Sequence, residues 1–591
     1  MDFALEKNEK QLLVSRQYTT WEIIKLYWKS EHKVFAYLFV AAVLALTILL
    51  VGFDVAFNYW SNYFYNALQE YNMHAAIRLL AAFFILAALY IIVAVYRYYL
   101  SQLLTLYWRR WLTEQLLGRW LEKKGYYYLE TFDVKTDNPD QRIQEDVNGL
   151  VSNSISLTVG LVSAVTTFPA FIYILWTLSG VLTLSLGPLG TIHIHGYLVW
   201  VGLLYNLVGT WITFKIGRPL IKLNFEQQQR EANFRFAAID LRSHAEQVAL
   251  YGGETHQRSI MNFHFVRVLD NWYAIVLRQK LLLWFTAGFN QAAVLLPFIV
   301  ALPNYFNKVF ELGGLMQSVR AFTSVQDSLS YLINSYTSIA DWRATCSRLT
   351  TFINHLNDAE MNAEKSDRVI MKQQPENAIA VKDLVIKSSH NNVLLDSIDE
   401  HFVHGNNYVI KGESGIGKST FIRTVAGIWP YASGEVILPE NKRVMYLPQK
   451  PYMPIGTLAE AILFPDKKDP ELEKHLETVL VDCHLADFIP RLYDTAHWSE
   501  ELSPGEQQRI AFARVLLHKP DWVFMDESTS MLDLANEKHL YTLLQERLPQ
   551  CSIISVGHHS SVDTFHQHVI NMNKYSRKVQ EVSASSQRCM T

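Results

Sequence analysis

Gly412-Glu-Ser-Gly-Ile-Gly-Lys-Ser419 lies between the apolar run Tyr408-Val-Ile410 and a segment of helical character that begins at Thr420. This octapeptide fits the pattern G-x-x-x-x-G-K-[ST], in which a glycine-rich loop joins a strand to a helix. The glycines let backbone N–H groups approach phosphate oxygens without a Cβ clash, and the helix N-terminus adds partial positive charge. The lysine reaches the β- and γ-phosphates, and the serine hydroxyl binds Mg²⁺. We therefore predict a site for a nucleoside triphosphate and Mg²⁺, formed by Gly412, Glu413, Ser414, Gly415, Ile416, Gly417, Lys418, Ser419 and Thr420.

A second motif, Trp522-Val-Phe-Met-Asp-Glu527, delivers two carboxylates at the end of an apolar run. Ligands of open parallel sheets bind outside the carboxyl ends of the strands, so we expect these carboxylates beside the phosphates. Asp526 is predicted to hold Mg²⁺ through water, and Glu527 to polarise the attacking water as the general base. The alternative is a polar strand end without a chemical role, and the phosphate-binding loop in the same chain argues against it.

Apolar runs and helical patterns alternate around these motifs. The runs expected to be strands are Ile379–Ile386, Asn407–Ile410, Arg443–Leu447, Trp522–Met525 and Ser552–Val556, and the expected helices are Thr420–Gly427, Glu506–Leu517 and Asn536–Glu546. Buried strands separated by helices are typical of an α/β domain. We place this domain at residues 379–591, after a polar linker at 355–378 that lacks periodicity.

The string Leu502-Ser-Pro-Gly-Glu-Gln-Gln-Arg509 precedes the two carboxylates. By itself it predicts the start of a helix, with Ser503 as the N-cap and Glu506 completing a capping box. It also resembles the signature sequence of the ATP-binding cassette (ABC) family, L-S-G-G-Q in its commonest form, although Pro504 and Glu506 depart from that form. The resemblance implies that the nucleotide is ATP. It also implies that Ser503, Gly505 and Glu506 contact the ATP held by a second ATPase domain.

Further segments resemble other elements of this family. Gln449, in Leu447-Pro-Gln-Lys450, matches the Q-loop, and Ser530-Met-Leu-Asp533 matches the D-loop. His558 matches the switch histidine that contacts the γ-phosphate. The resemblance thus implies a catalytic set and a Mg²⁺ set. The catalytic set is Glu527, His558 and Gln449, and the Mg²⁺ set is Ser419, Gln449 and Asp526.

One family element has no clear counterpart. The aromatic residue that usually stacks on adenine is replaced by Lys387, and His390 and Tyr408 are the nearby alternatives. The residue that stacks on adenine therefore stays unassigned.

Four stretches contain no Asp, Glu, Lys or Arg, namely residues 34–53, 79–96, 147–214 and 281–307. A helix that spans a bilayer needs about 20 apolar residues, so the long third stretch holds two spans and each of the others holds one. Only 18% of the chain is charged, against roughly 25% in soluble proteins. A sixth span, apolar on one face only, follows Gly313. The predicted spans, within a transmembrane domain of residues 1–354, are about 34–54, 75–97, 150–178, 190–214, 281–305 and 314–340.

Lysine and arginine gather on one side of this predicted bundle. Residues 96–149 carry eight and residues 214–281 carry ten, whereas 54–74 and 179–192 carry none. The positive-inside rule makes the long basic connections cytoplasmic. Both termini are then cytoplasmic, which requires an even number of spans and supports the sixth. The short termini and the lack of a peroxisomal address favour a multi-pass protein of a bacterial inner membrane.

The membrane half resembles a narrower branch of the ABC family. Segments that carry this resemblance include Asn138-Pro-Asp-Gln-Arg-Ile143, Glu231-Ala-Asn-Phe-Arg-Phe236 and Gly313-Gly-Leu-Met-Gln317. They are similar to fatty-acid exporters typified by peroxisomal half-transporters, and to bacterial SbmA/BacA-like relatives with their own ATPase domain. The resemblance implies an exporter-type fold, with an all-α six-helix transmembrane domain followed by an α/β P-loop ATPase domain. It also implies composite ATP sites, and a homodimer is the simplest partner arrangement because one chain contains every motif.

Two classes of function remain open at this point. The first is a transporter that uses ATP hydrolysis to move a solute by alternating access, and the second is a membrane-tethered regulatory ATPase. A tether needs one or two spans rather than six, which favours the transporter. The balance of 53 basic and 56 acidic residues excludes a strongly basic nucleic-acid binder. The four widely spaced cysteines exclude a disulfide scaffold and a cysteine-based zinc cluster.

The sixth predicted span carries a polar stripe that bears on the cargo. Its members recur at steps of three and four residues, and they are Arg320, Ser324, Asp327, Tyr331 and Asn334. Ionisable residues inside a membrane usually face a cavity or each other. We therefore expect a wet central chamber suited to a hydrophilic, peptide-like or vitamin B12-like solute, with a fatty acid or acyl-CoA as the alternative. Helix packing through hydrogen bonds is the competing interpretation of the stripe.

Overall fold

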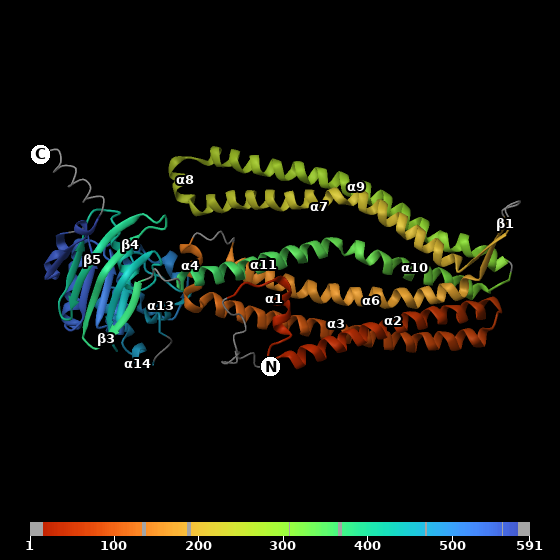
Figure 1. Ribbon diagram of the computed structural model, residues 1–591, viewed down its shortest axis with the longest axis horizontal. Coiled ribbons are helices and arrows are strands. Elements are labelled where there is room, and N and C mark those ends of the chain that lie inside the picture. The colour runs from red at the N-terminus through yellow and green to blue at the C-terminus, as the bar shows by residue number, and fades with distance from the viewer. Residues whose placement is uncertain are drawn as a thin grey trace. The chain divides into compact units, whose positions relative to one another are not determined.

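The computed structural model describes residues 16–132, 138–185, 191–306, 308–364, 369–466, 470–557 and 560–576. The chain forms two compact units (Figure 1). The first comprises the described residues of Met1–Tyr126 and Lys135–Asn357 and is mainly helical. The second comprises those of Tyr127–Val134 and Asp358–Thr591 and contains the larger β-sheets.

Long helices form the first unit. They are α2 (Lys33–Gln69), α3 (Met73–Leu121), α6 (Val147–Ser179), α7 (Tyr197–Ser243), α9 (Glu254–Phe306), α10 (Leu312–Asn334) and α11 (Tyr336–Glu364). Shorter helices lie at the ends of these, among them α1 (Thr20–Tyr27), α4 (Gly125–Thr131) and α8 (Ala245–Tyr251). Neighbouring long helices pair, α2 with α3, α6 with α10 and α7 with α9, and α8 follows the end of α7 (Figure 1).

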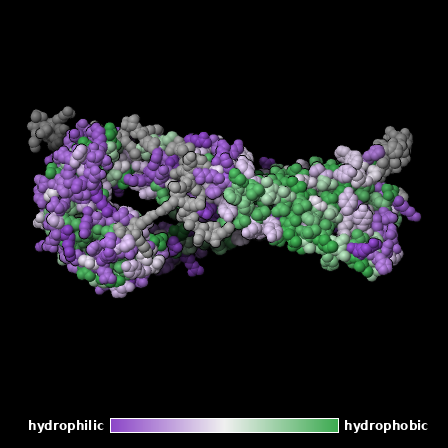
Figure 2. Space-filling view, turned by 90° about the horizontal axis from the view of Figure 1, so that it is seen from below, coloured by the Kyte–Doolittle hydropathy of each residue, from purple (hydrophilic) through white to green (hydrophobic). Residues whose placement is uncertain are grey.

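The surface of these helices is apolar over much of its length. In the described part of the chain, five helical segments are long and apolar enough to cross a membrane, and they contain α2, α3, α6, α7 and α9. Side chains such as Phe84 on α3 and Trp211 on α7 point outward, with 70% and 62% of their surface exposed. Figure 2 shows hydrophobic residues gathered in a band on the helical unit, with hydrophilic residues on both sides of it. Such a band is stable against lipid and not against water, so the protein is a multi-pass membrane protein.

A buried carboxylate fixes the junction between α6 and α11. Asp146 is 3% exposed and accepts from Arg142 Nη1 at 2.7 Å, and its two oxygens accept from Arg348 Nη2 and Nε at 2.6 and 3.1 Å. Two guanidinium groups compensate the buried charge, one of them in a bidentate arrangement. Loss of Asp146 would remove the acceptor that joins the buried Arg142 to the part-exposed Arg348 of α11, so this cluster ties the start of α6 to α11.

The second unit contains two larger sheets. The strands of a five-stranded parallel sheet, in spatial order, are β13 (His568–Asn571), β6 (Tyr408–Lys411), β12 (Ser552–Val556), β11 (Trp522–Asp526) and β8 (Val444–Leu447). The four-stranded sheet has the order β3 (Val369–Gln374), β7 (Ala432–Pro439), β4 (Ala378–Lys387) and β5 (Val393–Val403). The helices named below are α12 (Lys418–Val425), α17 (Pro504–His518) and α18 (Leu534–Arg547). Fully buried aromatic side chains such as Phe402, Phe421 and Phe524 form the core between the sheets and α12.

Two expectations from the sequence differ from the structure, the start of the fourth span and the linker. Residues 191–195, which the predicted fourth span included, form strand β2 (Thr191–His195), which pairs with β1 (Val181–Ser185). The sequence Thr-Ile-His-Ile-His alternates as a strand does, and Gly196 then turns the chain with φ of +68° into α7.

The predicted linker at 355–378 is mostly regular structure. Helix α11 continues through it to Glu364, and strand β3 follows. The side chains of Phe352, Leu356, Ala359 and Ala363 are all buried, and their spacing of four, three and four residues is the helical period. The sixth predicted span corresponds to α10, which ends at Asn334, and α10 is not among the five helices that satisfy the length and apolarity requirement. It therefore stays a prediction.

Candidate nucleotide-binding site

The glycine-rich loop follows β6 and ends at α12, as the sequence predicts. Gly415 and Gly417 have φ angles of +78° and +115°, which a residue with a side chain rarely adopts. The loop curls around the amine of Lys418, which donates to the carbonyls of Gly412 and Glu413 at 2.8 and 3.0 Å. Burial lowers the pKa of Lys418, and the neighbouring carboxylates of Glu527 and Asp526 oppose this shift. The loop therefore presents a buried amine beside backbone N–H groups, which is an arrangement suited to phosphate.

Ser419 and Asp526 meet at the carboxyl end of β11. The hydroxyl of Ser419 donates to Oδ1 of Asp526 at 2.8 Å. Asp526 is 9% exposed, and burial raises its pKa while the bond from Ser419 lowers it. A hydroxyl and a carboxylate that converge in this way offer the oxygen ligands that Mg²⁺ prefers. The residues present thus fit a magnesium ion.

Glu527 extends the site beyond the strand. Its backbone has φ of +48°, in the left-handed region, and its N–H donates to the carbonyl of Val556 at 3.2 Å. The side-chain amide of Gln449 donates to Oε2 of Glu527 at 3.0 Å. The structure therefore brings together five predicted site residues, namely Lys418, Ser419, Gln449, Asp526 and Glu527.

The segment that resembles the signature sequence opens helix α17. Ser503 is its N-cap, and its backbone N–H and hydroxyl both donate to Glu506 Oε2 at 2.8 Å, which completes the predicted capping box. Arg509 Nη2 lies 3.7 Å from the other oxygen of Glu506. A Cβ built on Gly505 would lie 3.1 Å from the carbonyl of Met531, so glycine allows the helix to approach residues 531–532 closely. In the described contacts, these three residues bind their own helix and residues 531–532.

Two residues without a predicted role connect the parts of the site. Gln508 is 1% exposed; its amide nitrogen lies 3.3 Å from the carbonyl of Gln449 and 3.4 Å from Ser530 Oγ, and its oxygen accepts from Met531 N–H at 3.0 Å. Gln508 therefore joins the signature segment to the Q-loop and the D-loop. It stands within the string that carries the family resemblance, and that position was the available signal.

The second such residue is Glu537, on α18. It is 3% exposed, and its two carboxylate oxygens accept from the hydroxyls of Thr529 and Ser561, both at 2.6 Å. Thr529 follows Glu527 by two residues, and Ser561 follows His558 by three. A glutamate on a helix gives no signal of this role in the sequence, because its partners lie on two other segments.

Two residues named in the sequence analysis do not join the site that the structure describes. His558, the predicted switch histidine, lies outside the described residues. Tyr408, an alternative for adenine stacking, is 6% exposed; its ring stacks on His568 with centroids 4.9 Å apart, and its hydroxyl accepts from the N–H of Val403. Tyr408 is therefore a core residue.

The polar stripe of α10 is partly involved in helix packing. Tyr331 donates to the carbonyl of Leu157 at 2.9 Å, and Arg320 Nη1 donates to the carbonyl of Phe57 at 3.3 Å. The side chains of Arg320, Asp327 and Asn334 are exposed on the isolated chain, and Ser324 is half-buried. These placements leave three of the five side chains accessible.

Comparisons with known proteins agree with this architecture. The family model described as ABC transporter transmembrane region 2 matches residues 23–306, and the model described as ABC transporter matches residues 395–530. The chain is 32% identical to the inner membrane ABC transporter ATP-binding protein YddA of Escherichia coli over 91% of this chain and 94% of that protein. It is 26% identical to the lysosomal cobalamin transporter ABCD4 of Mus musculus over 80% of this chain and 81% of that protein.

A solved structure shows the same fold. A bacterial Atm1-family ABC exporter with ATP bound superposes with a TM-score of 0.69, covering 90% of this chain and 93% of the exporter at 17% identity. Together, the nucleotide site, the membrane helices and these relatives establish the family. The chain belongs to the ABC transporters and is an exporter-type half-transporter, whose ATPase domain couples ATP hydrolysis to transport.

Proposed function

We propose that this chain is a homodimeric transporter that moves a hydrophilic solute, peptide-like or corrinoid-like, across a bacterial inner membrane with both termini in the cytoplasm. A half-transporter fold implies dimerisation, and the presence of a P-loop and a signature segment in one chain favours two identical copies. In this arrangement Ser503, Gly505 and Glu506 of one copy complete the ATP site of the other.

The proposed roles in hydrolysis follow from the contacts around Lys418. This lysine would neutralise the β- and γ-phosphates once its amine leaves the carbonyls of Gly412 and Glu413 and binds phosphate oxygens instead. Ser419, Asp526 and Gln449 would hold Mg²⁺, which neutralises phosphate charge when it is bound. Glu527 would orient and deprotonate the attacking water, and its bond from Gln449 supports this role because it fixes the carboxylate. We also propose His558 as the γ-phosphate contact, on the family resemblance alone.

The observation that supports a hydrophilic cargo is the exposure of Arg320 and Asp327 on α10. Charged side chains within a predicted span usually face a water-filled cavity, because burial in lipid is costly. One relative carries the name of a cobalamin transporter, which agrees with a large polar solute. The hydrogen bonds of Arg320 and Tyr331 to neighbouring helices support the competing packing interpretation and make the test necessary.

The test measures transport and ATP hydrolysis in sealed proteoliposomes with cobalamin, a hydrophilic peptide and an acyl-CoA as separate solutes. We expect a hydrophilic solute to stimulate hydrolysis in the wild type, and Asp327→Leu and Arg320→Leu to abolish that stimulation. Asp341→Leu, which alters an exposed carboxylate on α11 outside the stripe, is the matched control. Stimulation by the acyl-CoA alone, or normal transport of a hydrophilic solute by both stripe variants, would contradict the proposed cargo.

A further inference from the structure

Gln508, near the start of α17, is a buried side chain that contacts two other segments of the ATPase domain. Its amide nitrogen lies 3.3 Å from the carbonyl oxygen of Gln449 and 3.4 Å from Ser530 Oγ. Its amide oxygen accepts from the N–H of Met531 at 3.0 Å. An amide donates only through its nitrogen and accepts only through its oxygen, so these partners fix the orientation of the side chain.

The segment that carries Gln449 is irregular and is held by side chains of α17. Residues 448–455 form neither helix nor strand, and three of them are prolines, which lack the N–H that a backbone ladder needs. The carbonyl of Gln449 accepts from Gln508, and the carbonyl of Tyr452 accepts from Arg514 Nη2 at 2.6 Å. Both donors lie on α17, so this helix fixes the backbone of the segment at two points.

Gln449 connects this restraint to the hydrolysis site. Its side-chain amide donates to Oε2 of Glu527 at 3.0 Å, although Gln449 is an exposed residue. An exposed glutamine loses rotamer freedom when it holds a partner, and the cost is larger when its own backbone is also free to move. The bond from Gln508 fixes that backbone, so the amide of Gln449 stays on the carboxylate at a smaller entropic cost.

We propose that Gln508 is a positioning residue for ATP hydrolysis. By holding the carbonyl of Gln449, it keeps the amide of Gln449 on the carboxylate of Glu527. The contacts with Ser530 and Met531 hold the amide of Gln508 in the orientation that this role requires. The inference rests on the proposed function, in which Glu527 is the general base.

A double-mutant cycle tests whether Gln508 acts through Gln449. Gln508→Met keeps the length of the side chain and removes its donor and its acceptor. Single-turnover hydrolysis at saturating ATP resolves the slow variants. We expect the rate to fall about threefold to tenfold, the effect of one net hydrogen bond, while ATP affinity changes by less than about twofold. In a Gln449→Met background, the further loss should be less than about twofold, because the residue through which Gln508 acts no longer holds the carboxylate.

An equal fold-loss in the two backgrounds would overturn the proposal, and so would a normal rate in Gln508→Met. A weakened ATP affinity with an unchanged rate would also overturn it. Glu527→Gln separates these outcomes from a failure of the proposed function. If Glu527→Gln hydrolyses ATP normally, the proposed role of Glu527 is wrong. If Glu527→Gln is inactive and Gln508→Met is normal, only the role of Gln508 is wrong.

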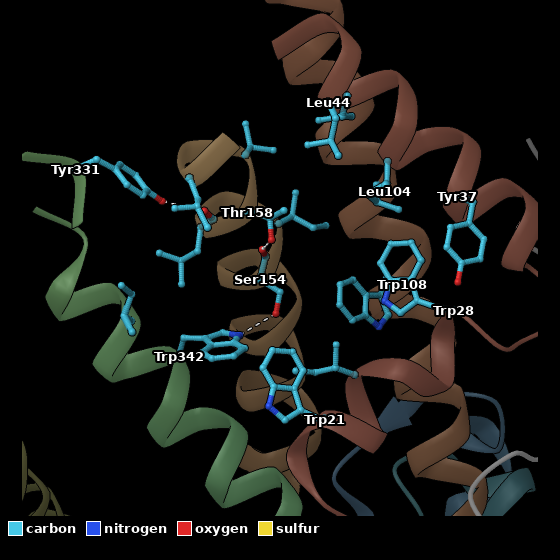
Figure 3. A pocket seen from close by; sticks show the side chains of 18 residues that line it. Trp21, Trp28, Tyr37, Leu44, Leu104, Trp108, Ser154, Thr158, Tyr331 and Trp342 are labelled. Atoms are coloured by element: carbon cyan, nitrogen blue, oxygen red, sulfur yellow. Dashed lines mark hydrogen bonds between the residues drawn. The ribbon is translucent and has the colours of Figure 1, made fainter. Parts of the chain in front are cut away.

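Two control variants each lose one side-chain hydrogen bond elsewhere. Tyr446→Phe removes the donor to the carbonyl of Val425 at 3.4 Å, on the strand that precedes Gln449. Trp342→Phe removes the bond from Trp342 Nε1 to Ser154 Oγ at 2.8 Å, in the wall of a cavity of about 520 Å³ in the helical unit (Figure 3). Both should hydrolyse ATP within about twofold of the wild-type rate. A loss in either control as large as that in Gln508→Met would overturn the specific role of Gln508.

Discussion

Glu537 offers a test of how the hydrolysis site is held together. Its buried carboxylate accepts two hydrogen bonds of 2.6 Å, one from Thr529, two residues after the proposed general base Glu527, and one from Ser561, three residues after the predicted switch histidine. The substitution Glu537→Gln keeps the size of the side chain but replaces one acceptor oxygen with an NH₂ donor. One of the two hydroxyls then faces a donor, and the link between the two segments is weakened.

The size of the effect follows from these contacts. A hydrogen bond to a charged group contributes about 1.5–3 kcal/mol, and about 1.4 kcal/mol corresponds to a tenfold change in rate. We therefore expect kcat for ATP hydrolysis to fall about tenfold or more. We expect KM for ATP to change by less than about threefold, because Lys418 and Ser419 keep their contacts.

The assay is steady-state ATP hydrolysis by purified protein in lipid nanodiscs, with kcat and KM determined separately. Glu546→Gln, an exposed change on the same helix α18, is the matched control and should behave as the wild type does. Size-exclusion profiles of both variants check that they are folded. A Glu537→Gln protein with normal kcat, or one whose defect lies only in KM, would refute the positioning role.

Further predictions concern the hydrolysis site, the contact of Phe132 with the ATPase unit, and the pH dependence of stability. Glu527→Gln should reduce hydrolysis at least about a hundredfold while ATP still binds, since it removes the proposed general base; hydrolysis within about threefold of the wild type would exclude that role. Lys418→Ala should weaken ATP binding itself, as measured by nucleotide titration, and unchanged affinity would count against the phosphate site. Phe132, whose ring meets that of Tyr431 edge-on at 5.6 Å, belongs to the ATPase unit although it follows α3. Phe132→Ala should keep basal hydrolysis but lose its stimulation by solute, which parallel assays of both would detect. Burial lowers the pKa of His566 below its usual 6.5, so the unfolded chain binds more protons than the folded chain below that pH. Resistance to thermal unfolding should therefore fall as the pH drops below 6.5, with a smaller loss in His566→Gln; equal slopes for the two proteins would contradict this.

The sequence by itself determined the elements whose signals are local. The phosphate-binding loop, the carboxylates of Asp526 and Glu527 and the capping box of Ser503 each occupy a few consecutive residues, so their geometry follows from backbone preferences and short-range hydrogen bonds. The long apolar helices can also be predicted from the sequence, because a helix that crosses a bilayer needs about 20 apolar residues. Membership of the ABC family followed from these same motifs and their order.

Tertiary structure decided which distant residues meet. The continuation of α11 through residues predicted as a linker depends on burial of Leu356 and Ala359, which composition alone does not reveal. Gln508 and Glu537 acquire their roles only when three segments of the ATPase domain come together. The stack of Tyr27 on Trp108 exists because α1 packs against α3, which follows it only after the whole of α2. Such contacts are set by packing between surfaces far apart in the chain, and no local pattern encodes the identity of the partner.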